Sequence, residues 1–205
     1  IVMGQNTPSI KVNAVRDRGA KVVLHGDNYD EASQHAKALC QAQGLVYIPP
    51  YDDVDVIAGQ GTIGMEIVNQ HSQPLDAIFV PVGGGGLVAG VAAYVKYLRP
   101  NTKIIGVEAL GSNCLDVAMK AGRRVRLPID QLDLFADGVS VAQIGKETFK
   151  VAKKYVDDVV VVNVDEICAA IKDVFEDTRC VAEPAGALAI AGMKRYVDAH
   201  PGMSH

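Results

Sequence analysis

Residues 77–98 read AIFVPVGGGGLVAGVAAYVKYL, and this stretch decides the fold. It predicts a strand over residues 77–82, a loop of four glycines at 83–86 and a helix over 87–98. Its first 19 residues carry no charge, which approaches the length of a membrane span. Pro81 and the glycines divide that run, so a strand, loop and helix are favoured and no membrane segment is expected.

On both sides of this stretch, short apolar runs alternate with helical segments, which is typical of α/β proteins. Thr7 as N-cap and Pro8 at the first helical position predict a helix that ends near Gly19. A capping box of Asn163 and Glu166 predicts the start of another. Further helices are expected at 29–43, in the second half of 54–70, and at 114–121, 144–155 and 185–200. Strands are expected at 21–24, 46–48, 103–108 and 159–162, with a domain junction near residues 49–50.

Composition restricts the class of protein. Of 205 residues, 49% are hydrophobic and 21% charged, which supports a full core and argues against disorder. A net charge of −4 argues against a nucleic-acid-binding surface. The four cysteines lie far apart and predict free thiols of a cytoplasmic protein, not a disulfide or zinc framework. The first residues also lack the pattern of a signal peptide.

The glycine cluster predicts an anion site. Without Cβ atoms, the N–H groups of Gly83, Gly84, Gly85 and Gly86 can converge on a phosphate at the start of the following helix. A tight turn alone would not justify four flexible residues, so a phosphate site is favoured. The loop is not a P-loop, because Val91-Ala92 stands where Lys-Ser or Lys-Thr is required.

A dinucleotide-binding loop is the alternative. Gly84-x-Gly86-x-x-Ala89 matches the fingerprint of a Rossmann-like module, and Glu108 ends the next strand where a ribose-binding acid would be expected. A non-catalytic phosphate- or dinucleotide-binding module therefore remains a competing hypothesis.

The motifs around the loop favour an enzyme. They are, in order, Pro8-x-x-Lys11 with Arg16-x-x-Gly19-Ala20, Gly26-x-x-Tyr29-Asp30-Glu31-Ala32, Pro49-Pro50-Tyr51-Asp52-Asp53 with residues 56–62, residues 80–90, residues 136–139 and residues 182–187. This set resembles the threonine dehydratase (threonine ammonia-lyase) family of tryptophan-synthase-β-like pyridoxal-phosphate enzymes. Serine racemase and serine dehydratase are similar as well.

The resemblance implies a three-layer αβα fold of the pyridoxal-phosphate fold type II, present here in incomplete form. Residues 1–50 would be a remnant of a small α/β domain and residues 51–205 most of the large cofactor-binding domain. Gly83–Gly86 and Leu87 would hold the phosphate of pyridoxal 5'-phosphate, and Glu183 would lie near its ring. The implied reaction is dehydration and deamination of L-threonine, or of L-serine, to a 2-oxo acid and ammonia.

Several family features have no match in this sequence. The Schiff-base lysine of the family lies in a Ser-Phe-Lys-x-Arg-Gly segment, which this sequence does not contain. No catalytic residue is therefore assigned, and the chain alone is expected to be inactive. Lys150 follows Thr148-Phe149 but is interpreted as a solvated helix lysine. Cys114 stands where metal-binding relatives have an acid, so no metal is expected. Asp52, Asp53 and Asp55 are interpreted as solvated loop acids.

The same comparison predicts the state of association. A chain that matches only the middle of the family would leave apolar surface and strand edges uncovered, so a homo-oligomer is expected.

Overall fold

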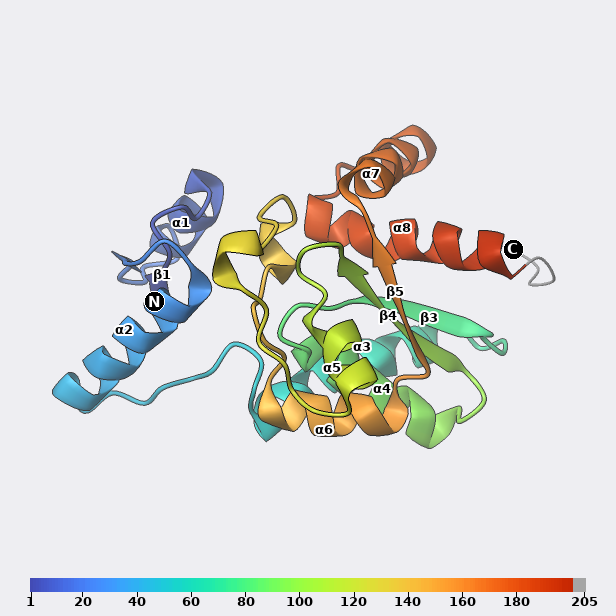
Figure 1. Cartoon of the computed structure of the whole chain (residues 1–205), viewed down its shortest axis with the longest axis horizontal. Coiled ribbons are helices and arrows are strands. Elements are labelled where there is room, and N and C mark those ends of the chain that lie inside the picture. Colours follow the sequence, from blue (N-terminus) through green and yellow to red (C-terminus); the bar gives the residue numbers. More distant parts are fainter. Residues whose placement is uncertain (201–205) are drawn as a thin grey trace. The chain divides into compact units, whose positions relative to one another are not determined.

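In a computed structural model, residues 1–200 of the chain are described. They divide into two compact units, Ile1–Pro49 and the residues from Pro50 onward. The first unit, at the blue end of the colour scale in Figure 1, pairs β1 (Val2–Met3) with β2 (Val23–Leu24) in a parallel ladder. Its helices are α1 (Ser9–Arg16) and α2 (Tyr29–Gln43).

Two local predictions in the first unit are wrong. Helix α1 begins at Ser9 with Pro8 as its N-cap, because the Pro8 carbonyl already accepts the N–H groups of Lys11 and Val12. Residues 46–48 form no strand. Val46 and Ile48 are 86% and 79% exposed, so their β-forming side chains have no neighbour to pack on. The prolines that follow remove two backbone donors, which also disfavours a ladder.

The second unit is built on a parallel sheet in the order β3-β4-β5. The strands are β3 (Ala77–Pro81), β4 (Lys103–Ala109) and β5 (Asp158–Val162). The helices are α3 (Val54–Gln70), α4 (Gly86–Leu98), α5 (Cys114–Ala121), α6 (Lys146–Tyr155), α7 (Val164–Thr178) and α8 (Pro184–Ala199), with short 3-10 turns η1 (Ile129–Gln131) and η2 (Asp137–Val139). The α/β prediction is therefore confirmed.

Helix α3 departs from its prediction because it is helical from Val54 onward, not only in its second half. Asp53 explains the early start, since its carboxylate accepts the N–H groups of Asp55 and Val56. The capping box predicted at Asn163 and Glu166 is confirmed at the start of α7. No helix in residues 1–200 is both long and apolar enough to cross a membrane.

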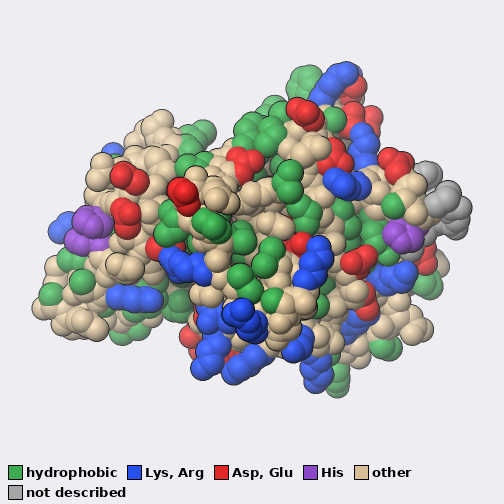
Figure 2. Space-filling view, viewed as in Figure 1, with side chains coloured by type: hydrophobic (Ala, Val, Ile, Leu, Met, Phe, Trp, Pro, Cys, Tyr) green, Lys and Arg blue, Asp and Glu red, His purple; other side chains and the backbone are tan. Residues whose placement is uncertain are grey.

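The outer faces of the helices carry most of the charge. Figure 2 shows Lys and Arg side chains gathered over α6, whose sequence includes four lysines. The lysines lie opposite the buried face of α6, which is formed by Thr148, Phe149 and Ala152.

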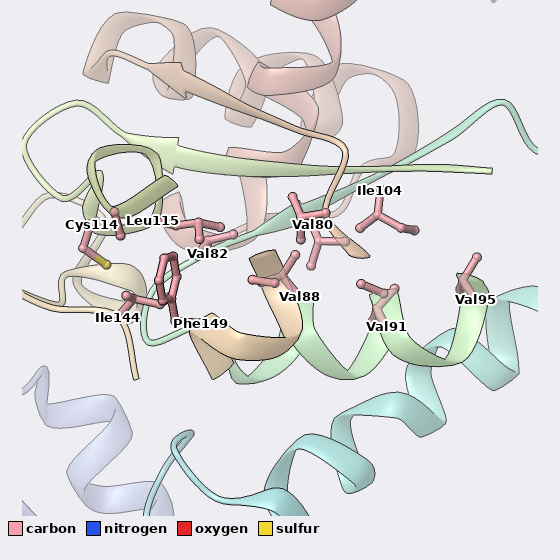
Figure 3. Close-up of a cluster of buried hydrophobic side chains, with 14 residues drawn as sticks. Val80, Val82, Val88, Val91, Val95, Ile104, Cys114, Leu115, Ile144 and Phe149 are labelled. Carbon is pink, nitrogen blue, oxygen red and sulfur yellow. The ribbon is translucent and has the colours of Figure 1, made fainter. Parts of the chain in front are cut away.

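The sheet lies between two helical layers, each with its own core (Figure 1). Side chains of β4 alternate between them: Ile104 belongs to the core shared with α4, α5 and α6, and Ile105 and Val107 to the core shared with α7 and α8. In Figure 3, Val88, Val91 and Val95 of α4 point toward Val80 and Ile104 of the sheet. Because both faces are covered, the strands are almost continuously apolar, as in other parallel sheets.

Helices α3 and α4 approach closely through glycines. A Cβ atom on Gly90 would lie 2.4 Å from the Ile57 carbonyl oxygen and 2.5 Å from the Gly61 nitrogen. Gly64 also lies near α4, although less tightly, since a Cβ there would be 3.3 Å from the Val91 carbonyl oxygen. This contact holds α4, and hence the glycine loop at its start, against the preceding helix.

Glu108 connects β4 to α5 by a buried carboxylate. Its side chain is fully buried, and its two oxygens accept the N–H groups of Leu115 and Asp116, each at 2.8 Å. Burial raises the pKa of Glu108 to about 8, which outweighs the opposite effect of these two hydrogen bonds. Helix α5 has no side-chain cap from its own N-cap residue, Asn113, so Glu108 takes that role.

The buried Glu108 predicts a pH-dependent stability. Because its folded pKa of about 8 lies above the ordinary 4.5, the folded state binds this proton more tightly than the unfolded state. Its contribution is complete below pH 4.5 and is lost as the pH rises toward 8. We expect Glu108→Gln, which cannot ionise, to remove a decline of up to about 1.4 kcal/mol per pH unit in the free energy of unfolding.

The measurement is urea unfolding of both proteins across this pH range. Glu66→Gln, which changes an exposed side chain on α3, is the matched control and should keep the slope of the wild type. Parallel slopes for Glu108→Gln and the wild type would show that Glu108 titrates normally.

Candidate functional site

The sequence-predicted loop lies at the carboxyl end of β3, where parallel α/β sheets commonly bind ligands. Gly83–Gly86 lead from β3 into the first turn of α4. Gly85 has a φ of +92°, a conformation that side chains rarely adopt, and is the N-cap of α4. Gly84, Gly85 and Gly86 are buried.

Every glycine of the loop is in close contact with another segment. A Cβ atom would lie 3.0 Å from Val139 at Gly83, 2.2 Å from the Tyr51 ring at Gly84, 2.5 Å from Ile144 at Gly85 and 3.2 Å from Tyr51 at Gly86. Packing alone therefore accounts for the absence of side chains. The run of glycines by itself is a weaker indication of phosphate binding than the sequence analysis assumed.

The backbone donors of the loop give a stronger indication. In residues 1–200, the structure gives no protein acceptor for the N–H groups of Gly84, Gly85, Gly86 and Leu87. Those of Gly86 and Leu87 belong to the first turn of α4, which leaves them without intrahelical acceptors. Buried backbone donors are almost always paired, and a helix N-terminus favours negative charge. An anion bound here would satisfy several donors together.

The carbonyl oxygen of Gly84 is bound by the start of α6 and by its N-cap residue. It accepts the hydroxyl of Thr148 at 2.8 Å and the N–H of Gly145 at 3.2 Å. Thr148 is fully buried, so this contact is shielded from water. Thr148 and Gly145 were not singled out by sequence reasoning, because they lie about 60 residues beyond the loop.

The prediction for Asp52 is wrong. It is not a solvated loop acid, because its carboxylate accepts the N–H groups of Lys146 and Glu147 at 2.8 and 2.7 Å. It thereby caps α6, whose own N-cap is Gly145. Asp53 is likewise a helix cap, that of α3. The role of Asp53 is local and could have been inferred from its position before α3, whereas the role of Asp52 depends on where the fold places α6.

Glu183 lies beside η2, at the start of α8. Its Oε1 atom is 3.8 Å from the position of a Cβ on Gly138, and the next residue, Val139, contacts Gly83. Glu183 is exposed, and η2 contacts both this residue and the glycine loop. The role of Glu183 beside a cofactor ring stays a prediction.

Glu108 and Cys114, at the positions considered for a ribose or a metal ion, form hydrogen bonds within the protein. Glu108, the expected ribose-binding acid, is buried with both oxygens bonded to α5, so the Rossmann-like alternative loses its key residue. Burial raises the pKa of the neighbouring Cys114 thiol, which donates to the Gly83 carbonyl at 3.4 Å. Residues 1–200 contain no group of three or more potential metal ligands.

Lys150 lies on the exposed face of α6, as expected. Its Nζ pairs with both carboxylate oxygens of Glu147 at 2.9 and 2.8 Å. It is therefore a surface ion-pair partner, which agrees with the interpretation of Thr148-Phe149-Lys150 as a chance similarity to the lysine motif.

Comparison with curated proteins gives relatives over nearly the whole chain. It is 57% identical over 200 residues to the biosynthetic L-threonine dehydratase of Pasteurella multocida, and the match covers 98% of this chain but 38% of that protein. It is 56% identical to the chloroplastic biosynthetic threonine dehydratase of Arabidopsis thaliana, covering 96% of this chain and 33% of the relative. The chain thus spans little more than a third of these relatives.

Solved structures give the same fold. The processed form of threonine deaminase isoform 2 from Solanum lycopersicum matches with a TM-score of 0.91 and 49% identity, over 98% of this chain and 58% of that one. Serine racemase from Dictyostelium discoideum matches with a TM-score of 0.83 and 33% identity, over 97% and 63%. The predicted three-layer αβα architecture of pyridoxal-phosphate fold type II is confirmed by these matches.

A family model described as "pyridoxal-phosphate dependent enzyme" matches residues 1–202. The layered sheet, the glycine loop at the carboxyl end of β3 and this match agree, and the chain belongs to the pyridoxal-phosphate dependent enzyme family.

Proposed function

We propose that this chain carries the cofactor-phosphate site of a pyridoxal-phosphate-dependent threonine dehydratase. The observation that carries the proposal is that the N–H groups of Gly84–Leu87, at the start of α4, have no acceptor among residues 1–200. The identity of more than half of the aligned residues to proteins named biosynthetic threonine dehydratases supports L-threonine as the substrate and isoleucine biosynthesis as the setting.

The residues present fit the cofactor's phosphate. Gly83–Gly86 and Leu87 would hold it through backbone N–H groups, aided by the positive end of α4. Glu183 would lie near the ring. When bound, pyridoxal phosphate would supply the electron sink for loss of the α-proton and the β-hydroxyl of the substrate. The chain's own residues would bind and orient the group, and the buried layers behind the loop would keep water from that side.

The two compact units support an assignment to family domains. Ile1–Pro49 would correspond to part of the small α/β domain and the residues from Pro50 onward to most of the large domain. The four cysteines are free thiols, which supports a reducing, cytoplasmic location.

Phosphate binding is tested by removing one donor. Leu87→Pro deletes the N–H of the second residue of α4, where the first turn tolerates proline. We expect about a tenfold loss of affinity for inorganic phosphate, measured by phosphate-dependent thermal stabilisation. Leu87→Ala is the matched control, because it loses the same side chain but keeps the N–H group. Equal binding by the two variants would place the anion elsewhere.

Gly84 itself is a poor target for this test. A side chain there would meet the Tyr51 ring at 2.2 Å, so the substitution would disturb packing whether or not a phosphate binds.

The 205-residue chain by itself should form no 2-oxobutanoate from L-threonine, because none of its lysines lies in a segment like the family's Schiff-base motif. Borohydride reduction in the presence of pyridoxal phosphate, followed by peptide mapping, should find no lysine modified stoichiometrically. Lys150→Ala serves as the control for an adventitious adduct on α6. Formation of 2-oxobutanoate together with one fully modified lysine would contradict the expectation that the chain alone is inactive.

We also propose that the chain associates with itself. Large apolar side chains are exposed in the second unit, among them Val54, Tyr97, Leu110 and Val181. Within the described sheet, β3 and β5 each have one neighbour, which leaves their outer edges unpaired. Light scattering over a concentration series should give a mass that rises above the monomer. A monomeric mass at every concentration, with no binding of a hydrophobic dye, would contradict this.

A further inference from the structure

Asp52 follows Tyr51, whose ring lies against Gly84 of the glycine loop, and its carboxylate acts on a helix far along the sequence. Its Oδ2 accepts the N–H of Lys146 and its Oδ1 those of Glu147 and Thr148, over 94 to 96 residues of separation. The Cβ position of Gly145 lies 2.5 Å from Oδ1, so any other residue at 145 would collide with this carboxylate. Helix α6 therefore receives its cap from Asp52 and from no residue at its own N-cap position.

The first turn of α6 in turn fixes the peptide between Gly84 and Gly85. Its two donors, the Thr148 hydroxyl and the Gly145 N–H, bind the Gly84 carbonyl. In a planar trans peptide the C=O and the following N–H point in opposite directions. Holding the Gly84 carbonyl toward α6 therefore directs the Gly85 N–H away from α6.

Tyr51, the residue before Asp52, packs against the same glycine loop. The Tyr51 ring covers Gly84, and the Tyr51 backbone lies 3.2 Å from the Cβ position of Gly86. Tyr51 thus contacts the loop directly, and Asp52 acts on it through α6. Both follow Pro49, where the first compact unit ends.

We propose that Asp52 is a positioning residue of the phosphate site, which it sets through α6 and the Gly84 carbonyl. The inference rests on the proposed function, because it concerns the affinity of that same loop for phosphate. Without the carboxylate, three N–H groups of α6 lose their acceptor and the Gly145–Thr148 turn is released. The Gly84–Gly85 peptide is then free to rotate, and the donors of the loop no longer converge.

Asp52→Asn is the principal variant, because it keeps the shape of the side chain and one oxygen for Glu147 and Thr148, but it removes the charge and replaces the acceptor of the Lys146 N–H by an NH2 group that cannot accept. Asp53→Asn is the matched control, since Asp53 is the adjacent residue and also caps a helix, α3, through two N–H groups. The probe is inorganic phosphate, and its dissociation constant is measured well below the melting temperature of each variant. We expect both variants to melt earlier, and Asp52→Asn alone to bind phosphate about tenfold or more weakly.

A second pair of variants tests the same path without altering the cap. Thr148→Val removes the hydroxyl that binds Gly84, and Thr148→Ser retains it. Phosphate affinity should fall in the first variant and be largely kept in the second. This pair decides the matter if Asp52→Asn does not fold.

The outcomes separate the two proposals. A wild-type protein that binds no phosphate overturns both the proposed function and the role of Asp52. A wild type that binds phosphate, with unchanged affinity in Asp52→Asn or in Thr148→Val, overturns only the role of Asp52. Equal weakening by Asp52→Asn and Asp53→Asn would also overturn it, because general loss of stability would then explain the effect.

Discussion

The close approach of two segments to the backbone of Gly84 constrains the rest of the second unit. The Tyr51 ring lies against its α-carbon, where no Cβ could be accommodated, and its carbonyl is bound by Thr148 and Gly145. These contacts join the residues after Pro49, the end of β3 and the start of α6 at one point. Helix α4 begins beside this point, so the N–H groups of its first turn follow a loop that has little freedom to move.

Several carboxylates in this protein satisfy helix N-termini. Asp52, Asp53 and Glu108 each accept backbone N–H groups at the start of α6, α3 and α5. The common cause is the unpaired donors and positive potential of a helix N-terminus. It also explains why acids that look available for chemistry in the sequence are not. A residue of this kind can still affect function when the helix that it fixes carries groups that hold a ligand.

The family match and the arrangement of the loop point to the same half of an active site. The donors of Gly84–Leu87 suit a phosphate, and η2 contacts both the glycine loop, through Val139, and Glu183, through Gly138. The chain spans 38% of the length of the Pasteurella multocida relative. Under the proposed function, the residues of this chain would bind and orient the phosphate of the cofactor.

The sequence by itself determined the elements whose signals are local. The apolar runs at residues 77–81 and 103–109, the helix after the four glycines and the capping box of Asn163 and Glu166 all depend on neighbours within a few residues. Tertiary structure decided the rest. The predicted strand at 46–48 lacks a partner, which no local pattern could reveal. Asp52 caps a helix 94 residues away, and Glu108 is buried by α5, because a carboxylate binds whichever donors the fold brings to it. Likewise, the four glycines show in the sequence only that side chains are excluded; the packing of Tyr51, Val139 and Ile144 against them is the physical reason, and it depends on segments that meet only in the folded chain.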